Sequence, residues 1–286
     1  MRNKLLAFLL CILFLSTITK LANAELSAFV QNDFLTWEEL LPSGKVTESG
    51  TLWKGGIRYS HTFKSINFTI FTSLLGGHGK TEYKGYIATL SASIINKISS
   101  YETDVNRVTV QLDIGGKKEI YRKKNFKGGI KGVVEGIVVS RELPDYTITA
   151  TDTFGSPIEI RLSGPWEVWS IINLKGGIYG DYRFARDFVL ISEAGINYPI
   201  KTSVDVSEQA YNFTTGEILN LENTLKPDGK IGFYVGLGIK WSAENSGGLG
   251  LFLNYDVRRF DWSKYYHTSG VVTNYKLLFL RLDCTF

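Results

Sequence analysis

The sequence predicts an all-β protein: a transmembrane antiparallel β-barrel of about ten strands, with short turns at one end and long loops at the other. Several segments alternate apolar and polar side chains, which is the period of a strand with one apolar face. After residue 24 no apolar run approaches the roughly 20 residues that a membrane-spanning helix needs, so a membrane protein with this sequence must cross as a barrel. Composition agrees, with 29 glycines, 15 Tyr, 17 Phe and 6 Trp but only six prolines.

Residues 1–24 predict a secretory signal peptide, and residues 25–286 a single exported domain. The segment begins MRNK, continues with a short apolar run and ends in the small-residue pattern Ala22-Asn23-Ala24, which predicts cleavage before Glu25. Removing it leaves 29 basic against 28 acidic residues, so no nucleic-acid footprint is expected. Cys284 becomes the only cysteine, which excludes an internal disulfide and a cysteine-based zinc site.

Seven segments alternate clearly, and three more, of which the one near 118–131 is weak, complete the set of ten predicted strands. In 51–63, for example, Trp53, Ile57 and Tyr59 share one face, while Lys54 and Arg58 share the other. The predicted strands lie near 26–37, 51–63, 66–74, 107–114, 118–131, 166–181, 187–198, 231–241, 248–258 and 277–286.

The predicted connections alternate in length, which is typical of membrane barrels. Short connections are expected at 64–65, 115–118, 182–186 and 242–247. Long ones are expected at 38–50, 76–104, 132–164, 199–228 and 259–272. A soluble two-sheet sandwich is the competing fold, and this regular alternation argues against it.

The last strand, LLFLRLDCTF, places apolar side chains on one face and ends in an aromatic residue. With the signal peptide and ten amphipathic strands, this resembles bacterial outer-membrane β-barrel proteins. The segments PWEVWSIINLKGGIYGDYRF, SEAGINYPI and YDVRRFDWS also resemble small porin-like barrels. The resemblance implies export through the Sec pathway, insertion by the barrel-assembly machinery, and contact with outer-membrane lipid and lipopolysaccharide. The implied assembly signal consists of Leu278, Leu280, Leu282, Cys284 and Phe286.

If the apolar faces meet lipid, the polar faces point into the lumen. The predicted inward charges are seven basic and seven acidic, and a ten-stranded lumen is narrow. We therefore expect a network of ion pairs that mostly plugs the barrel, because unpaired charges there carry a large desolvation cost. Its members are Asp33, Lys54, Arg58, Arg107, Asp113, Glu167, Lys175, Asp181, Glu193, Lys240, Asp256, Arg258, Arg281 and Asp283.

Two enzyme families have related architectures, and neither is matched by its motif. Omptin proteases are ten-stranded and use acidic residues with an Asp-His pair at the outer rim. Here His61 is predicted near the inner end of a strand, while His78 and His267 are predicted in outer loops. The sequence His267-Thr268-Ser269 has the His-x-Ser spacing of lipid A deacylases, which are eight-stranded. An ordinary loop explains these three residues more simply.

The sequence therefore predicts an integral outer-membrane barrel, non-enzymatic in the leading hypothesis, with a structural or surface-interaction role through its outer loops. A narrow porin-like channel is the alternative, because inward glycines would leave space in the lumen; an omptin-like or lipid A-modifying hydrolase comes third. No cofactor or metal site is expected. A basic cluster between Lys117 and Lys131 could contact phosphates of lipopolysaccharide. A solvated strand end and turn is the favoured explanation, because the cluster starts on the periplasmic side.

Overall fold

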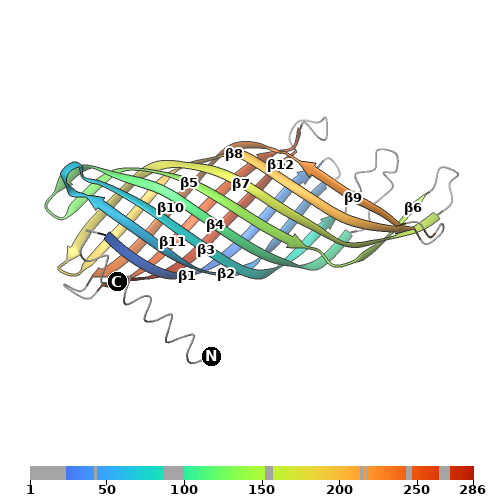
Figure 1. Ribbon diagram of the computed structural model, residues 1–286, viewed down its shortest axis with the longest axis horizontal. Helices are drawn as coiled ribbons and strands as arrows, with labels where there is room; N and C mark the ends of the chain where they lie inside the picture. Colours follow the sequence, from blue (N-terminus) through green and yellow to red (C-terminus); the bar gives the residue numbers. More distant parts are fainter. Residues whose placement is uncertain are drawn as a thin grey trace, which may run out of the picture.

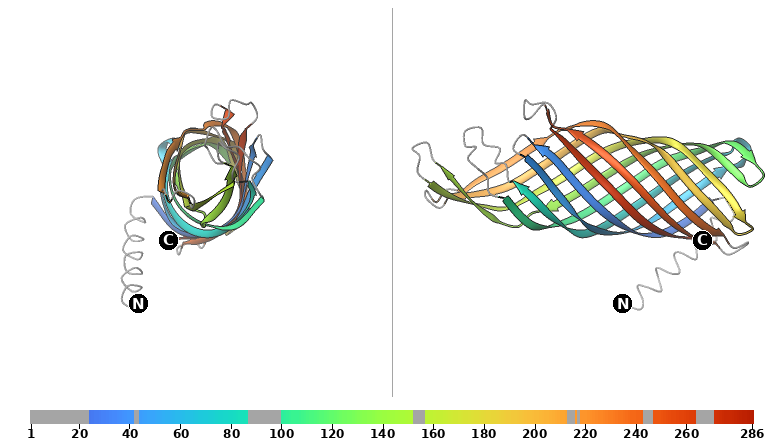
Figure 2. Two further views of the ribbon diagram at one scale, coloured as in Figure 1. Left: turned by 90° about the vertical axis from the view of Figure 1, so that its right-hand side faces the viewer. Right: turned by 180° about the vertical axis from the view of Figure 1, so that it is seen from behind.

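The chain forms one antiparallel sheet that closes on itself as a barrel (Figures 1 and 2). The computed structural model describes residues 24–41, 44–86, 100–151, 157–212, 216, 218–242, 247–263 and 271–286. The predicted signal peptide lies outside these residues, except for Ala24. No helix among the described residues is long and apolar enough to cross a membrane.

Ten strands build the wall, and each pairs with its neighbours until β12 meets β1 and β7 meets β8. They are β1 (Ala24–Leu41), β2 (Gly44–Phe63), β3 (Phe68–Tyr86), β4 (Ser100–Lys123), β5 (Phe126–Glu142), β7 (Pro157–Ala185), β8 (Phe188–Asn212), β10 (Asp228–Ser242), β11 (Gly248–Asp261) and β12 (Val272–Thr285). The predicted closed ten-stranded antiparallel barrel is confirmed.

The two ends of the barrel differ. One end, the turn end, carries the connections from β2 to β3, β4 to β5, β7 to β8 and β10 to β11, together with both ends of the described chain (Figure 1). There the Phe286 amide donates to the Leu26 carbonyl at 2.9 Å. At the other end, the arm end, β7 and β8 continue past the ring. There β6 (Tyr146–Thr151) pairs with β7, and β9 (Ile218–Leu225) pairs with β8, so that four strands form a projecting arm.

The outer surface of the barrel is apolar. Along β11, Leu249, Leu251 and Leu253 are 47–51% exposed, while the residues between them face the lumen. Exposed aromatic side chains flank the short turns, as membrane-interface girdles do. They include Phe63, Phe126, Phe184, Phe188 and Trp241.

One predicted turn is wrong. Residues 115–118 lie inside β4, and the chain reverses at Lys124-Asn125, where Lys124 adopts a left-handed φ of 44°. The prediction rested on Gly115 and Gly116, because glycines often mark turns. Here they are strand residues covered by aromatic rings, since a Cβ on Gly115 would lie 2.5 Å from Phe71.

Four predicted long loops are mostly strand. The segment 76–104 contains the end of β3 and the start of β4, and 199–228 contains the end of β8, all of β9 and the start of β10. The segment 38–50 forms the paired ends of β1 and β2, with Leu41 opposite Gly44. The segment 132–164 contains most of β5, all of β6 and the start of β7. His78, predicted in an outer loop, is an exposed residue within β3, opposite Trp53. His267 lies outside the described residues.

Candidate functional site in the barrel lumen

The lumen is lined by polar and charged side chains from every wall strand. All fourteen charges predicted to point inward occupy buried or half-buried positions. Eleven of them lie within 4 Å of an opposite charge; among the described residues, Arg58, Asp113 and Asp181 have no such partner. Asp113 instead accepts hydrogen bonds from Ser73 at 2.9 Å and Gln111 at 2.8 Å.

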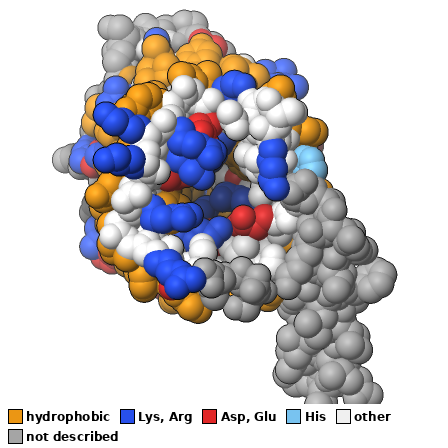
Figure 3. Space-filling view, turned by 90° about the vertical axis from the view of Figure 1, so that its left-hand side faces the viewer, with side chains coloured by type: hydrophobic (Ala, Val, Ile, Leu, Met, Phe, Trp, Pro, Cys, Tyr) orange, Lys and Arg blue, Asp and Glu red, His pale blue; other side chains and the backbone are white. Residues whose placement is uncertain are grey.

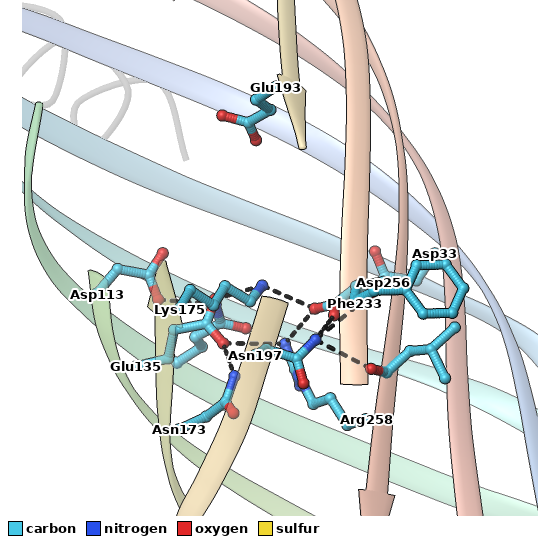
Figure 4. A network of polar contacts seen from close by, with 12 residues as sticks. Asp33, Asp113, Glu135, Asn173, Lys175, Glu193, Asn197, Phe233, Asp256 and Arg258 are labelled. Carbon is cyan, nitrogen blue, oxygen red and sulfur yellow. Dashed lines mark hydrogen bonds and ion pairs between the residues drawn. The ribbon is translucent and has the colours of Figure 1, made fainter. Parts of the chain in front are cut away.

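A midbarrel network crosses the centre of the lumen (Figure 4). Its members are Glu135, Asn173, Lys175, Asn197, Asp256 and Arg258. The Lys175 ammonium bridges Glu135 and Asp256 at 2.7 Å each, and the Arg258 guanidinium contacts the same two carboxylates at 3.2 and 3.0 Å. Asn173 donates to Glu135 and Asn197 to Asp256. Because four strands contribute, the network ties opposite walls together.

A second group, the guanidinium cluster, lies nearer the arm end and consists of Glu48, Arg107, Arg141 and Glu167. Glu48 contacts Arg107 at 2.5 Å and Arg141 at 2.7 Å, and Arg141 also contacts Glu167 at 2.5 Å. Glu48 and Arg107 are fully buried. Both guanidinium groups lie over the Trp37 ring, at 5.2 and 5.6 Å from its centroid.

An aromatic plug fills the lumen beside this cluster. It comprises Trp37, Trp169, Phe260, Trp262 and Tyr275, with ring centroids 4.5 to 6.5 Å apart. Its tryptophan N–H groups are satisfied: Trp169 donates to Glu167 and Trp262 to Thr273. Buried aliphatic side chains surround the rings. The arm half of the lumen is therefore packed like the core of a soluble protein.

The inward glycines on which the channel hypothesis depends are covered by neighbouring side chains, although Gly236, Gly238 and Gly250 also line a cavity at the turn end. A Cβ on Gly195 would be 2.8 Å from the Tyr234 ring, and one on Gly56 would be 2.5 Å from Phe29. Gly177, Gly232, Gly236, Gly238 and Gly250 are covered in the same way by Tyr234, Asn197, Asn254 and Phe252. These glycines make room for large inward side chains.

At the turn end the lumen is hollow (Figure 3). A cavity of about 180 Å³ lies behind a mouth with many Lys and Arg side chains, and a second of about 80 Å³ lies deeper, next to the midbarrel network. Both are lined by Arg58, Phe71, Lys131, Glu193 and Arg281. The lumen is thus open at the turn end and filled toward the arm end.

The arm-end rim carries one strongly acidic carboxyl group. The Ser263 amide donates to Asp261 at 2.8 Å, and the Lys230 ammonium lies 2.9 Å away. The Ser263 side chain, the Lys230 ammonium and the Ser263 amide, in decreasing order of effect, lower the pKa of Asp261 to about 2 through hydrogen bonds.

The described residues contain no group of His, Cys, Asp and Glu that could hold a metal ion. His61 packs edge-on against Phe63, and His78 faces outward. Within the described part of the chain neither imidazole contacts a carboxylate. The predicted assembly-signal residues Leu278, Leu280 and Leu282 are exposed on the outer face, and Cys284 and Phe286 are half-buried.

Sequence reasoning missed several lumen residues with large roles in this geometry. Glu48, Glu135 and Arg141 fell in segments expected to be loops, and Lys131 was assigned to a solvated strand end. Extending the alternating pattern beyond the apolar segments would have identified them, because every second residue in 132–142 faces the lumen.

No family model matches the chain, and no curated protein does either. Solved structures do match. The outer-membrane protease OmpT of Escherichia coli is 12% identical, with 92% of this chain and 97% of OmpT covered, at a TM-score of 0.51. A major outer-membrane protein of Thermus thermophilus is 11% identical over 92% of this chain and 99% of its own, at 0.42. The chain has the fold of outer-membrane β-barrels.

Proposed function

From this fold we propose that the protein is an integral barrel of the bacterial outer membrane, exported by its signal peptide and inserted with the turn end facing the periplasm. The apolar outer surface and the aromatic residues beside the short turns support this placement. Lipid and lipopolysaccharide are then its immediate surroundings. Heat-modifiable migration of protein from the outer-membrane fraction tests the proposal; unshifted protein in the soluble periplasm would contradict it.

The barrel is proposed to be closed to solutes. The observation that carries this is the filled arm half of the lumen, where Trp169 is 2% and Phe260 0% exposed. The guanidinium cluster and the midbarrel network lie on the same path. A hydrated pore would need continuous polar space through this region, whereas the two lumen cavities described above lie on the turn-end side of the midbarrel network.

Planar-bilayer recording tests closure. Purified protein that shows heat modifiability is expected to give no single-channel steps, whereas a known porin in the same bilayer gives them. Trp169→Ala combined with Phe260→Ala removes much of the aromatic plug, and we expect small, unsteady conductance. Trp53→Ala, on the lipid face and 58% exposed, is the matched control and stays silent. Steady conductance of the wild-type protein would contradict closure.

We propose that the projecting arm gives the protein a surface-interaction role. Strands β6 and β9 are the outer edges of the four-stranded extension, and edge strands present unpaired backbone groups to a partner. The arm comes from two of the five long connections that the sequence predicts, 132–164 and 199–228. An armless variant, with short turns in place of residues 143–163 and 208–226, is expected to keep the barrel and lose cell-to-surface adhesion. Unchanged adhesion would refute the role.

The proposal is non-enzymatic. A rim hydrolase needs a histidine within hydrogen-bond reach of a carboxylate or hydroxyl group. Neither described histidine makes that contact, and the resemblance to OmpT is a resemblance of the fold alone.

A further inference from the structure

The larger turn-end cavity is bounded by more positive than negative side chains. Its charged lining consists of the cations Arg58, Lys117, Lys131, Lys240 and Arg281 and the anions Glu25, Glu193 and Asp283. The remaining lining is mostly small or polar, with Phe71 and Phe252 as large apolar surfaces. In Figure 3 the mouth of this hollow is ringed by Lys and Arg side chains.

Each of the three carboxylates already has a cation. Lys131 contacts Glu193 at 2.7 Å, and Lys240 contacts Glu25 at 2.8 Å. The third pair joins two residues of the same strand, Arg281 and Asp283, at 2.7 Å. These pairs use all the negative charge that lines the cavity.

Two cations, Arg58 and Lys117, remain without a counter-ion. The Arg58 guanidinium lies 5.4 Å from the Phe71 ring centroid, and its buried Nε has no hydrogen-bond partner. The Lys117 ammonium lies 5.1 Å from the Tyr179 ring centroid. Glu193 and Asp181 attract Lys117 only over a longer distance, because no carboxylate of the described residues lies within 4 Å of its ammonium group. Asp283, Asp113 and Glu193 attract Arg58 in the same way, again from beyond 4 Å.

Unpaired charges in a confined lumen are unfavourable, and an aromatic face compensates only part of the lost hydration. A bound anion would supply what the protein lacks. Arg58 offers a planar fork of N–H donors that matches the oxygens of phosphate, and Lys117 adds a compact positive charge. A dianion balances both cations, whereas a single carboxylate balances one.

We infer that this cavity is a binding site for a small phosphate dianion, inorganic phosphate or a phosphate monoester, that enters from the turn end. Its volume of about 180 Å³ accommodates a molecule of that size. Beyond Arg58 and Arg281 the space narrows to the 80 Å³ chamber and ends at the midbarrel network. The site is therefore a dead end that binds its ligand without passing it on. This inference is independent of the role proposed for the arm.

Isothermal titration of the full mature chain with inorganic phosphate tests the inference. The protein is kept in a maltoside detergent, which carries no phosphate, at low ionic strength to limit screening. We expect saturable binding that weakens about tenfold or more in the Arg58→Gln/Lys117→Gln variant, because a charged hydrogen bond contributes on that scale. Lys64→Gln/Lys123→Gln removes the same charge from exposed residues at the same end and is expected to bind like wild type.

A second titration distinguishes the source of the phosphate group. Phosphatidic acid, a lipid whose headgroup is a phosphate monoester, is titrated in mixed maltoside micelles with and without inorganic phosphate. This titration shows whether a lipid headgroup uses the same two side chains. Binding of inorganic phosphate that depends on Arg58 and Lys117 supports a soluble ligand. Binding of the lipid alone, with the same dependence, supports a headgroup. The inference is overturned if neither probe binds, or if the cavity variant and the control bind equally.

Folding of every variant is checked by heat modifiability. If the double variant does not fold, Lys117→Gln alone repeats the test, because Lys117 makes no hydrogen bond or ion pair in the described structure and its loss leaves no partner unsatisfied. Reduced phosphate binding by this folded single variant supports the inference, and unchanged binding refutes it.

Discussion

Glu48 holds two buried guanidinium groups, so removing its charge should destabilise the barrel strongly. It contacts Arg107 at 2.5 Å and Arg141 at 2.7 Å, and it accepts a hydrogen bond from Thr81. Arg141 keeps a second carboxylate, Glu167, at 2.5 Å. Arg107 has no other carboxylate within 4 Å among the described residues. The Glu48→Gln variant therefore leaves one buried cation without compensation.

The free energy of unfolding should fall by about 3–5 kcal/mol, the range for breaking a buried ion pair by removing one partner. That is a large fraction of the roughly 5–15 kcal/mol by which most proteins are stable. Replacing both partners, as in Glu48→Met/Arg107→Met, removes the buried charge as well as the pair. Most of the stability should return, because well-packed apolar residues often replace a buried ion pair without loss.

Urea unfolding in phosphatidylcholine vesicles, followed by tryptophan fluorescence, measures these changes, since the cluster adjoins Trp37. Glu102→Gln is the matched control, because its ion pair with Lys84 is exposed to solvent and should contribute little to stability. If Glu48→Gln costs as little as this control, or if the double methionine variant is the less stable of the two, the account of the cluster is wrong.

Three further predictions follow from single positions. Gly195→Val should lower the free energy of unfolding by about 1–3 kcal/mol through overpacking, because its Cβ would meet the backbone of Gly176 and Gly177 as well as the Tyr234 ring. Gly176→Val, on the open lipid face, should be nearly neutral in the same urea titration. The carboxyl carbon of Asp261 should titrate near pH 2 by NMR, and at a higher pH in the Lys230→Met variant. Because the pKa of Asp261 in the folded protein lies below the ordinary 3.8, its contribution to folding stability is present above pH 3.8 and disappears as the pH falls toward 2. Phe286→Ala should reduce assembled barrel in the outer-membrane fraction yet refold normally in detergent; equal loss in both would reject an assembly signal.

The strand count and the lumen-facing residues were predictable from sequence, because lipid outside and polar groups inside impose a period of two. The signal weakens once a strand leaves the apolar band. In β2, Thr47 and Ser49 face outward at the arm end while Val46 faces the lumen. Here polar side chains face outward and apolar side chains face inward, the reverse of the pattern in the membrane. The sequence of segment 38–50 therefore resembles that of a loop.

The aromatic plug was not predictable as a unit. Trp37 and Trp169 come from strands that are distant in the chain, and Trp262 follows the end of β11. Each residue alone is consistent with an interfacial girdle, where tryptophan is common in membrane proteins. Only the closed register, which places β1, β7 and β11 around one lumen, brings these rings into contact.

Buried charges are a costly way to fill a lumen, and apolar residues of similar volume would often be as stable. On the proposed export route, however, apolar residues would have a second consequence. In β7 the outward residues between 166 and 178 are largely apolar, and Glu167, Asn173 and Lys175 interrupt them from the lumen side. With leucine at these three positions the segment would approach the roughly 17–25 apolar residues that insert as a membrane helix. On that route the lumen charges would keep the strand from inserting as a helix, and the ion pairs of the closed barrel would offset the cost of burying them.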